Sequence, residues 1–184
     1  MRTLSRRQFT RLAAASPLLL RGASLDGALP TRPLGKMGFK ASILGLGGQR
    51  VGDQPTAQAI VDRIVAEAIE HGLNYVDTAR GYGPSEERLG RALKGKRDKV
   101  FLVSKTRSAT REAALADLKE SLRNLQTDHL DCLLIHNISR EDGFPNFEET
   151  LSEKGALGAL LEAKKQGMIR HIGCSAHTYP AFPI

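Results

Sequence analysis

Short apolar runs alternate with one-faced helical patterns over most of this chain. The apolar runs predict strands at 43–46, 73–76, 100–103, 130–135 and 168–174. Between them, apolar residues recur at intervals of three and four, which predicts amphipathic helices in each connection. Buried strands that alternate with such helices are typical of a parallel sheet covered by helices. The sequence therefore predicts an α/β fold.

A β-hairpin is predicted before the first of these strands. Arg32 to Ser42 reads as two short strands joined by a turn at Gly35–Gly38. The glycines further on, Gly45 and Gly47, resemble the start of a dinucleotide-binding fingerprint. The third glycine of that fingerprint is missing, because position 50 is Arg50, so the Rossmann interpretation fails.

Polar residues occur at regular intervals where the predicted strands end. The landmarks are Gly47, Asp77, Lys105, His136 and Ser175, separated by 30, 28, 31 and 39 residues. This spacing indicates a repeated βα unit. Because α/β folds place their chemistry at the carboxyl ends of parallel strands, these side chains are expected to lie along one edge of the sheet.

The loop Asp77–Glu86 brings a carboxylate and the phenol of Tyr82 within five positions of each other. A nearby ammonium, supplied by Lys105, would stabilise the phenolate that remains after Tyr82 gives up a proton. Neutral His136 could donate a hydrogen bond to developing negative charge. Singly, these residues could instead be a turn cap, a loop aromatic, a solvated strand end and a core histidine; their common register favours a catalytic site.

The helix after this loop has an amino terminus that fits the capping rules. Ser85 is expected to cap it, and Glu86 and Glu87 stand in its first turn, where negative charge suits the helix dipole. Helix capping is therefore the first interpretation of Ser85 and Glu86.

The chain from about Arg32 to Ser175 resembles the N-terminal part of the aldo-keto reductase family. The motifs that carry the resemblance are Arg32-Pro33-Leu34-Gly35, Asp77-Thr78-Ala79 with Tyr82-Gly83 and Ser85-Glu86, Ser104-Lys105-Thr106, Leu134-Ile135-His136, and Gly167-Met168-Ile169-Arg170-His171-Ile172-Gly173. The resemblance implies an incomplete (β/α)8 TIM barrel of about five βα strands, preceded by the hairpin.

By the same resemblance, the chain would reduce aldehyde or ketone carbonyls to alcohols. Tyr82 would act as the general acid, Lys105 would assist its ionisation, Asp77 would hold Lys105, and His136 would orient a small carbonyl substrate. The resemblance does not identify that substrate further.

The resemblance also implies a nicotinamide cofactor, NADPH, with NADH as the alternative. Gly48, Asp77 and Ser175 are the expected cofactor-binding residues. Gly48 stands where the family often has threonine, and Ala176 stands where an asparagine commonly follows the serine.

Only nine residues follow Ser175, whereas a full barrel takes about 250 residues. Residues 30–184 are therefore expected to form a partial barrel domain that binds the cofactor weakly by itself. Two interpretations stay open: the N-terminal part of a carbonyl reductase, or an inactive remnant or binding module. Open sheet edges would favour self-association.

The first 29 residues are expected to be a twin-arginine signal peptide. Ser5-Arg6-Arg7-Gln8-Phe9 is followed by an apolar run from Leu12 to Leu20 and by small residues near Ala23 and Ala28. The run is shorter than the roughly 20 residues that span a bilayer as a helix, so stable membrane insertion is not expected. The expectation is export by the Tat machinery to the periplasm or another extracytoplasmic space.

The positive charge of the chain does not indicate a nucleic-acid partner. The formal net charge is +7, but residues 1–29 carry +4 of it and leave +3 for the rest. Aromatic residues make up only 5% of the chain, so few side chains are present on which nucleic-acid bases could stack.

The two cysteines are expected to be small core residues. Export would permit a disulfide, but strand alternation points Cys132 and Cys174 to opposite faces. The same alternation separates His171 from Cys174, so no metal site is expected at His171, Cys174 and His177.

Overall fold

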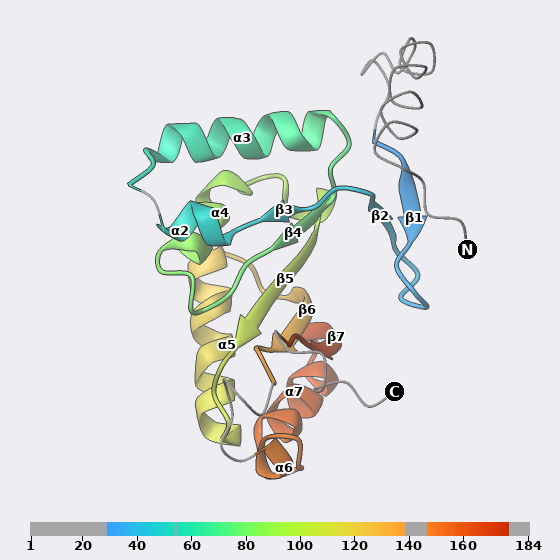
Figure 1. Cartoon of the computed structure of the whole chain (residues 1–184), viewed down its shortest axis with the longest axis vertical. Coiled ribbons are helices and arrows are strands. Elements are labelled where there is room, and N and C mark those ends of the chain that lie inside the picture. Colours follow the sequence, from blue (N-terminus) through green and yellow to red (C-terminus); the bar gives the residue numbers. More distant parts are fainter. Residues whose placement is uncertain (1–28, 54, 139–146, 177–184) are drawn as a thin grey trace, which may run out of the picture.

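The computed structural model describes residues 29–53, 55–138 and 147–176 as a curved parallel sheet with helices along its outer face (Figure 1). The predicted signal peptide, residues 1–29, lies outside the described residues except for Leu29. His177, one member of the rejected metal group, lies outside them as well.

Five strands form the sheet, and their spatial order follows the chain. The strands are β3 (Leu46–Gly47), β4 (Tyr75–Asp77), β5 (Phe101–Thr106), β6 (Leu130–Ile135) and β7 (Ile169–Cys174). All four pairings are parallel. The predicted βα repeat is confirmed, and β3 and β7 are the two edges of the sheet.

The connections between the strands supply the helical layer. Its helices are α2 (Gln49–Asp53), α3 (Gln58–Glu70), α4 (Ser85–Ala92), the 3-10 helix η2 (Arg97–Lys99), α5 (Arg111–Leu125), α6 (Phe147–Thr150) and α7 (Ala156–Lys165). Thr110 caps α5, since its side chain accepts a hydrogen bond from the backbone N of Ala113 at 3.4 Å. None of the helices in the described part of the chain has the length and apolar character needed to cross a bilayer.

Strand alternation divides the apolar side chains between two cores. Leu102 and Leu133 face the helices and join the larger cluster with the buried sides of α3, α4, α5 and α7. Phe101, Val103 and Cys132 face the other way and form a smaller inner cluster. The outer core therefore fixes the curvature of the sheet, while the inner cluster lies below the strand ends.

The predicted hairpin is confirmed and covers this inner cluster. Its strands β1 (Thr31–Pro33) and β2 (Lys40–Ser42) pair antiparallel. Leu34 and Phe39 pack against the inner cluster, and the rings of Phe39 and Phe101 lie 5.0 Å apart between centroids. Figure 1 shows the hairpin on the side of the sheet away from the helices.

Two predictions made from hydrophobicity are wrong in detail. The first strand begins at Leu46, not at Ile43, and the side chains of Ile43 and Leu44 are 52% and 58% exposed because they belong to the link between the hairpin and the sheet. On α3, Val61 and Val65 are buried, but Ile60 and Ile64 are each 44% exposed. The apolar stripe of α3 is therefore wider than the face that the sheet covers.

The two cysteines differ more than expected. Cys132 is buried in the inner cluster, whereas Cys174 is exposed, so the prediction of a core residue is wrong for Cys174. Cys174 is in register with Ile135, which faces the helices, and both thiols are free. The reason is the position of β7 at the sheet edge, where a side chain lacks neighbours from a next strand.

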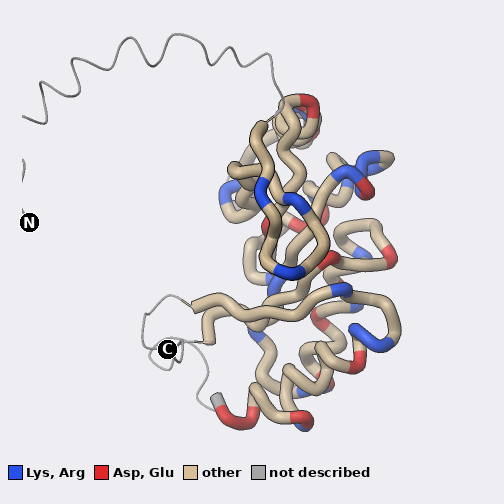
Figure 2. Tube along the Cα trace, turned by 90° about the vertical axis from the view of Figure 1, so that its right-hand side faces the viewer, with Lys and Arg blue, Asp and Glu red and all other residues tan. Residues whose placement is uncertain are grey.

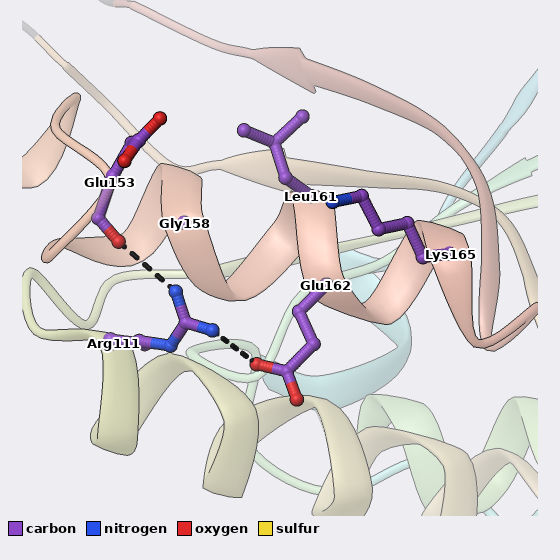
Figure 3. A pocket seen from close by; sticks show the side chains of 6 residues that line it. All are labelled: Arg111, Glu153, Gly158, Leu161, Glu162 and Lys165. Carbon is purple, nitrogen blue, oxygen red and sulfur yellow. Dashed lines mark hydrogen bonds and ion pairs between the residues drawn. The ribbon is translucent and has the colours of Figure 1, made fainter.

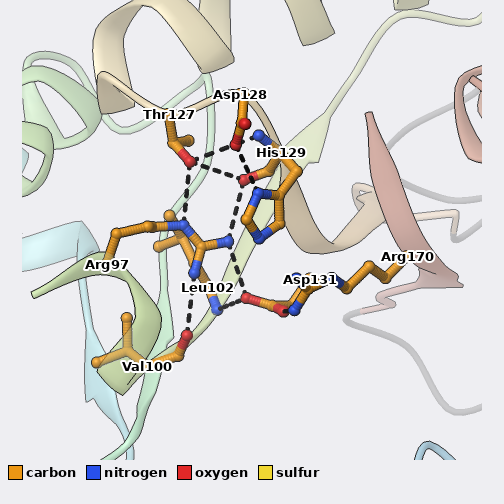
Figure 4. Close-up of polar contacts among 8 residues, drawn as sticks. All are labelled: Arg97, Val100, Leu102, Thr127, Asp128, His129, Asp131 and Arg170. Carbon is orange, nitrogen blue, oxygen red and sulfur yellow. Dashed lines mark hydrogen bonds and ion pairs between the residues drawn. The ribbon is translucent and has the colours of Figure 1, made fainter. Parts of the chain in front are cut away.

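A buried carboxylate joins the amino ends of the three longest strands (Figure 4). Asp131 on β6 accepts hydrogen bonds from the backbone N of Leu102 at 2.9 Å, from Arg97 Nη2 at 2.9 Å and from Arg170 Nη1 at 2.7 Å. Arg97 also donates to the carbonyl oxygens of Val100 and of the residue before β6, at 3.0 Å each. This network fixes the end of the sheet that lies opposite the candidate site.

Candidate active site

The four predicted catalytic residues meet at the carboxyl edge of the sheet. Asp77 is the last residue of β4, Tyr82 follows in the next loop, and His136 comes directly after β6. Lys105 lies inside β5, not past its end as predicted, because the β5–β6 pairing continues to Thr106 opposite Ile135. Lys105 thus projects from a fully paired strand.

The ammonium of Lys105 is the centre of the site. Its Nζ donates to Asp77 Oδ1 and, at 2.9 Å, to the carbonyl oxygen of Thr78. Tyr82 Oη lies 3.4 Å from the same nitrogen, which also stands 4.8 Å from the centroid of the Tyr82 ring. Lys105 is only 5% exposed, so these contacts replace most of its hydration. The structure therefore brings a cation to the phenol, as the sequence predicted.

His136 lies against the edge of the phenol. The rings of Tyr82 and His136 are 5.7 Å apart between centroids and nearly perpendicular, at 85°. The backbone N of His136 donates to the carbonyl oxygen of Thr106 at 2.8 Å, which ties the start of this loop to β5. An imidazole and a phenol thus border the same space above the strand ends.

The residues predicted to bind the cofactor lie along the same edge. Ser175 Oγ accepts a hydrogen bond from the backbone N of Asn137 at 3.0 Å, so its own hydroxyl proton remains available to a ligand. Position 48 has no room for a side chain, because a Cβ built on Gly48 would lie 2.8 Å from Asp77 O and 2.8 Å from Ser85 Oγ. At Gly47 a Cβ would meet no atom within 4 Å.

A second glycine sets the position of the general-acid candidate. A Cβ at Gly52, on α2, would lie 1.7 Å from the carbonyl oxygen of Tyr82. The obstructing atom belongs to the backbone, so a side chain at position 52 could not be accommodated by a rotamer change of a neighbour. Gly52 therefore lets α2 pack directly against the loop that carries Tyr82.

Glu86 has a different role from the predicted one. Pro84, not Ser85, stands at the N-cap of α4, and the Ser85 hydroxyl donates to Gly48 O at 2.7 Å. Glu86 is 0% exposed; its carboxylate accepts from Arg80 Nη1 at 2.7 Å and from Ser104 Oγ at 2.6 Å. The predicted cap by Ser85 is therefore wrong, because its side chain turns into the protein. Glu86 and Glu87 do stand in the first turn of α4 as predicted, but the Glu86 carboxylate is bonded inside the protein.

The Glu86 carboxylate joins the loop that carries Tyr82 to the outer face of β5. Arg80 comes from the loop between Asp77 and Tyr82, and Ser104 directly precedes Lys105 on the strand. The backbone N of Arg80 also donates to Lys105 O at 3.1 Å. The sequence contains one signal for this ion pair, because Arg80 stands six positions before Glu86 in a loop rich in glycine. The capping rule offered another explanation for Glu86, so the signal was missed.

A second carboxylate extends the network along the same face. Asp117 on α5 accepts from Thr106 Oγ1 at 2.5 Å and from Ser108 Oγ at 2.8 Å. Its other oxygen lies 4.0 Å from Arg80 Nε. The two polar residues of β5 that flank Lys105 are thus both bonded to carboxylates on the helix side.

Below the site, the inner face has little charge at neutral pH. Burial, followed by the charges of Asp131 and Asp77, raises the pKa of the Cys132 thiol to about 11. Burial, and then Asp77 and Cys132, also raise the pKa of Tyr75. Both groups stay protonated, so the pair formed by Asp77 and Lys105 dominates the local field.

Two hollows of the described surface lie away from these residues. One, between α5 and α7, is lined by Arg111, Glu153, Gly158, Leu161, Glu162 and Lys165 (Figure 3). Arg111 spans it, with Nη2 2.5 Å from Glu162 Oε2 and Nη1 3.1 Å from Glu153 O. Another is lined by Arg32, Pro33, Leu34, Ala41, Ser42 and Ile43 of the hairpin and its exit. Neither contains a predicted catalytic residue.

Comparisons with known proteins agree with this geometry. Residues 43–181 match the family model described as "Aldo/keto reductase family". The methylglyoxal reductase DkgB of Salmonella typhi is 35% identical over 141 residues, which cover 74% of this chain and 48% of that protein. The methylglyoxal reductase YeaE of Escherichia coli is 36% identical over 140 residues, 74% of this chain and 46% of that protein. The chain thus spans about half the length of these curated relatives.

Solved structures show the same arrangement of elements. A putative aldo-keto reductase from Pseudomonas aeruginosa superposes with a TM-score of 0.72 and 31% identity, over 82% of this chain and 62% of that one. An aldo/keto reductase from Klebsiella pneumoniae, in complex with NADP and acetate, gives 0.63 and 33% identity over 77% of this chain and 48% of that one. The parallel sheet is therefore a partial (β/α)8 barrel.

Replacing Glu86 tests the buried network. Glu86→Gln keeps the shape of the side chain but removes the carboxylate that is hydrogen-bonded to Arg80, so we expect the free energy of unfolding to fall by about 3 kcal/mol. Urea unfolding followed by circular dichroism measures the change. The matched control is Glu87→Gln, at the exposed neighbouring position on α4, which should shift the value by about 0.5 kcal/mol or less. Equal effects of the two substitutions would show that the buried Glu86 carboxylate contributes no more to stability than an exposed one.

Proposed function

Because this chain belongs to the aldo/keto reductase family, we propose that it reduces aldehyde or ketone carbonyls to alcohols with NADPH, or alternatively NADH, as the hydride donor. One observation carries the proposal. A single buried ammonium, that of Lys105, contacts both Asp77 and the phenol oxygen of Tyr82 at the carboxyl edge of the sheet. The chain spans about half the length of its curated relatives. The activity of the whole protein is therefore a proposal that rests on the site residues of this chain.

The residues present can perform the proton-transfer part of such a reaction. Tyr82 donates its phenolic proton to the carbonyl oxygen, and Lys105 stabilises the phenolate that remains. Asp77 and the carbonyl of Thr78 hold the ammonium in place. His136, beside the phenol, orients the carbonyl oxygen by a hydrogen bond. The nicotinamide cofactor, when bound, supplies the hydride.

The strand ends fit the nicotinamide end of this cofactor in part. The Ser175 hydroxyl can donate to a carboxamide, and open space adjoins Gly47. Gly48 can contribute backbone contacts only, since a side chain there would meet Asp77 O. Ser175, Gly48 and Asp77 are thus the residues that we propose to hold the nicotinamide.

The names of the relatives suggest a first substrate to try. Two of them are methylglyoxal reductases, so we propose small aldehydes that carry a second oxygen beside the carbonyl as substrates of this chain.

The general-acid role is tested by Tyr82→Phe. The change removes the proton donor and keeps the ring against His136, so we expect NADPH oxidation with methylglyoxal to fall by a factor of about 10² to 10⁴. Absorbance at the reduced-nicotinamide band measures the rate. Tyr75→Phe, which alters the half-buried phenol of the inner face, is the control and should retain turnover.

The outcomes separate the two interpretations of the chain. Turnover by the unaltered chain that Tyr82→Phe leaves intact would remove Tyr82 from its role. No turnover with either coenzyme, in a chain that still folds, would favour the inactive remnant or binding module.

We also propose export through the twin-arginine pathway, supported by the arrangement of Arg6, Arg7 and the apolar run that follows. In a bacterium that has this pathway, Arg6→Lys with Arg7→Lys should leave the protein inside the cell, as cell fractionation would show. The charge-matched control is Arg2→Lys with Arg11→Lys, which should be exported normally. Export of both variants alike would contradict the proposal.

Self-association through the sheet edges is a further proposal. Strands β3 and β7 each pair with one neighbour, and exposed isoleucines lie on α3. Sedimentation velocity over a wide concentration range should show species heavier than the 20.0 kDa chain. A single monomeric species at every concentration would rule this out.

A further inference from the structure

We propose that Arg107 binds an anionic group on the carbonyl substrate and so selects substrates that carry a carboxylate or a phosphate. The inference rests on the proposed carbonyl reduction and narrows its substrate class. It concerns a residue outside the predicted catalytic set.

Arg107 stands beside the general-acid candidate. It follows Thr106, the last residue of β5, and alternation along the strand puts it on the same side as Lys105. A Cβ built on Gly81 would lie 3.9 Å from Arg107 Cδ, and Gly81 directly precedes Tyr82. The stem of Arg107 therefore lies against the loop that carries the phenol, while the residue as a whole is exposed.

The charge of Arg107 is not neutralised by the carboxylates around the site. Asp77 is bonded to Lys105, Glu86 to Arg80 and Ser104, and Asp117 to Thr106 and Ser108. Over the ranges of the chain that the structure describes, the Arg107 guanidinium makes neither an ion pair nor a hydrogen bond, unlike the arginines at 80, 97, 111 and 170.

Arg91 is also an exposed arginine without a described partner, so what distinguishes Arg107 is its place beside the loop that carries Tyr82. Lysines, arginines and acids are intermixed over the described chain (Figure 2). At the rim, however, Asp77 and Lys105 cancel each other, which leaves Arg107 as a net positive charge near the reacting centre. An anion there would meet an attractive field, and the described carboxylates around the site are already bonded to partners.

The guanidinium fits two classes of anion. Its planar donors match the paired oxygens of a carboxylate or a phosphate. Because the Arg107 stem lies against Gly81, next to Tyr82, a substrate held by such a pair would lie beside the loop that carries the phenol. The alternative is that the Arg107 side chain is fully hydrated and contacts no ligand.

The test compares matched pairs of anionic and neutral substrates. The pairs are pyruvate with methyl pyruvate, and glyceraldehyde 3-phosphate with glyceraldehyde, each reduced by the full chain with NADPH. For Arg107→Gln, we expect the ratio of kcat/KM, anionic over neutral, to fall about tenfold in at least one pair, mainly through KM. Arg107→Lys should restore part of the ratio, and added salt should lower it in the unaltered chain.

Arg91→Gln is the matched control, because Arg91 is an exposed arginine on α4 and its loss changes the net charge equally. It should leave both ratios unchanged. Ligand-observed NMR of pyruvate and of glyceraldehyde 3-phosphate with the cofactor-free chain adds a measurement that needs no turnover. There, Arg107→Gln should weaken binding about tenfold and Arg91→Gln should not.

Each outcome bears on one of the two proposals. Reduction of the neutral substrates, with no effect of Arg107→Gln on either ratio, overturns the role of Arg107 and leaves carbonyl reduction standing. No turnover with any substrate counts against carbonyl reduction, and the NMR comparison then decides on Arg107. A loss of NADPH affinity with unchanged substrate ratios would assign Arg107 to the cofactor and overturn the proposal.

Discussion

The loop that carries Tyr82, residues 78–86, is held to strand β5 from both faces of the sheet. On the inner face, Lys105 bonds to Asp77 at the start of the loop and approaches Tyr82 in its middle. On the outer face, Ser104 bonds to Glu86 at the end of the loop, and Glu86 bonds to Arg80. Because successive side chains of a strand point to opposite faces, two adjacent residues of β5 can anchor the loop in two directions.

This double attachment explains a buried charge that would otherwise be costly. Burying the carboxylate of Glu86 requires partners, and a cation and a hydroxyl supply them. The two partners, Arg80 and Ser104, belong to the loop and the strand that carry the site. The contacts that stabilise the buried Glu86 carboxylate therefore also fix the position of Tyr82. Gly52 adds a third contact, since α2 reaches the Tyr82 backbone only without a side chain at that position.

The sequence predicted which residues converge, but not how each is held. Strand-end spacing placed Tyr82 and Lys105 on one edge because parallel strands in sequential order bring their carboxyl ends together. The role of Glu86 was missed because a glutamate after Ser85 satisfies the rules for a helix start equally well, and only tertiary packing shows that its carboxylate turns inward. Cys174 was misjudged because hydrophobicity cannot distinguish an edge strand from a central one.

The polarity of the site follows from what lies beneath it. The hairpin covers Phe101 with Phe39, and the half-buried phenol of Tyr75 and the buried thiol of Cys132 remain protonated, so the floor is mostly apolar and uncharged. Over such a floor, the attraction between Asp77 and Lys105 is weakly screened and keeps the ammonium fixed near Tyr82. Arg107 lies beyond that floor in solvent, where its attraction for an anion is weaker and more readily reversed. A fixed inner cation suits proton transfer, and a hydrated outer cation suits the capture and release of a substrate.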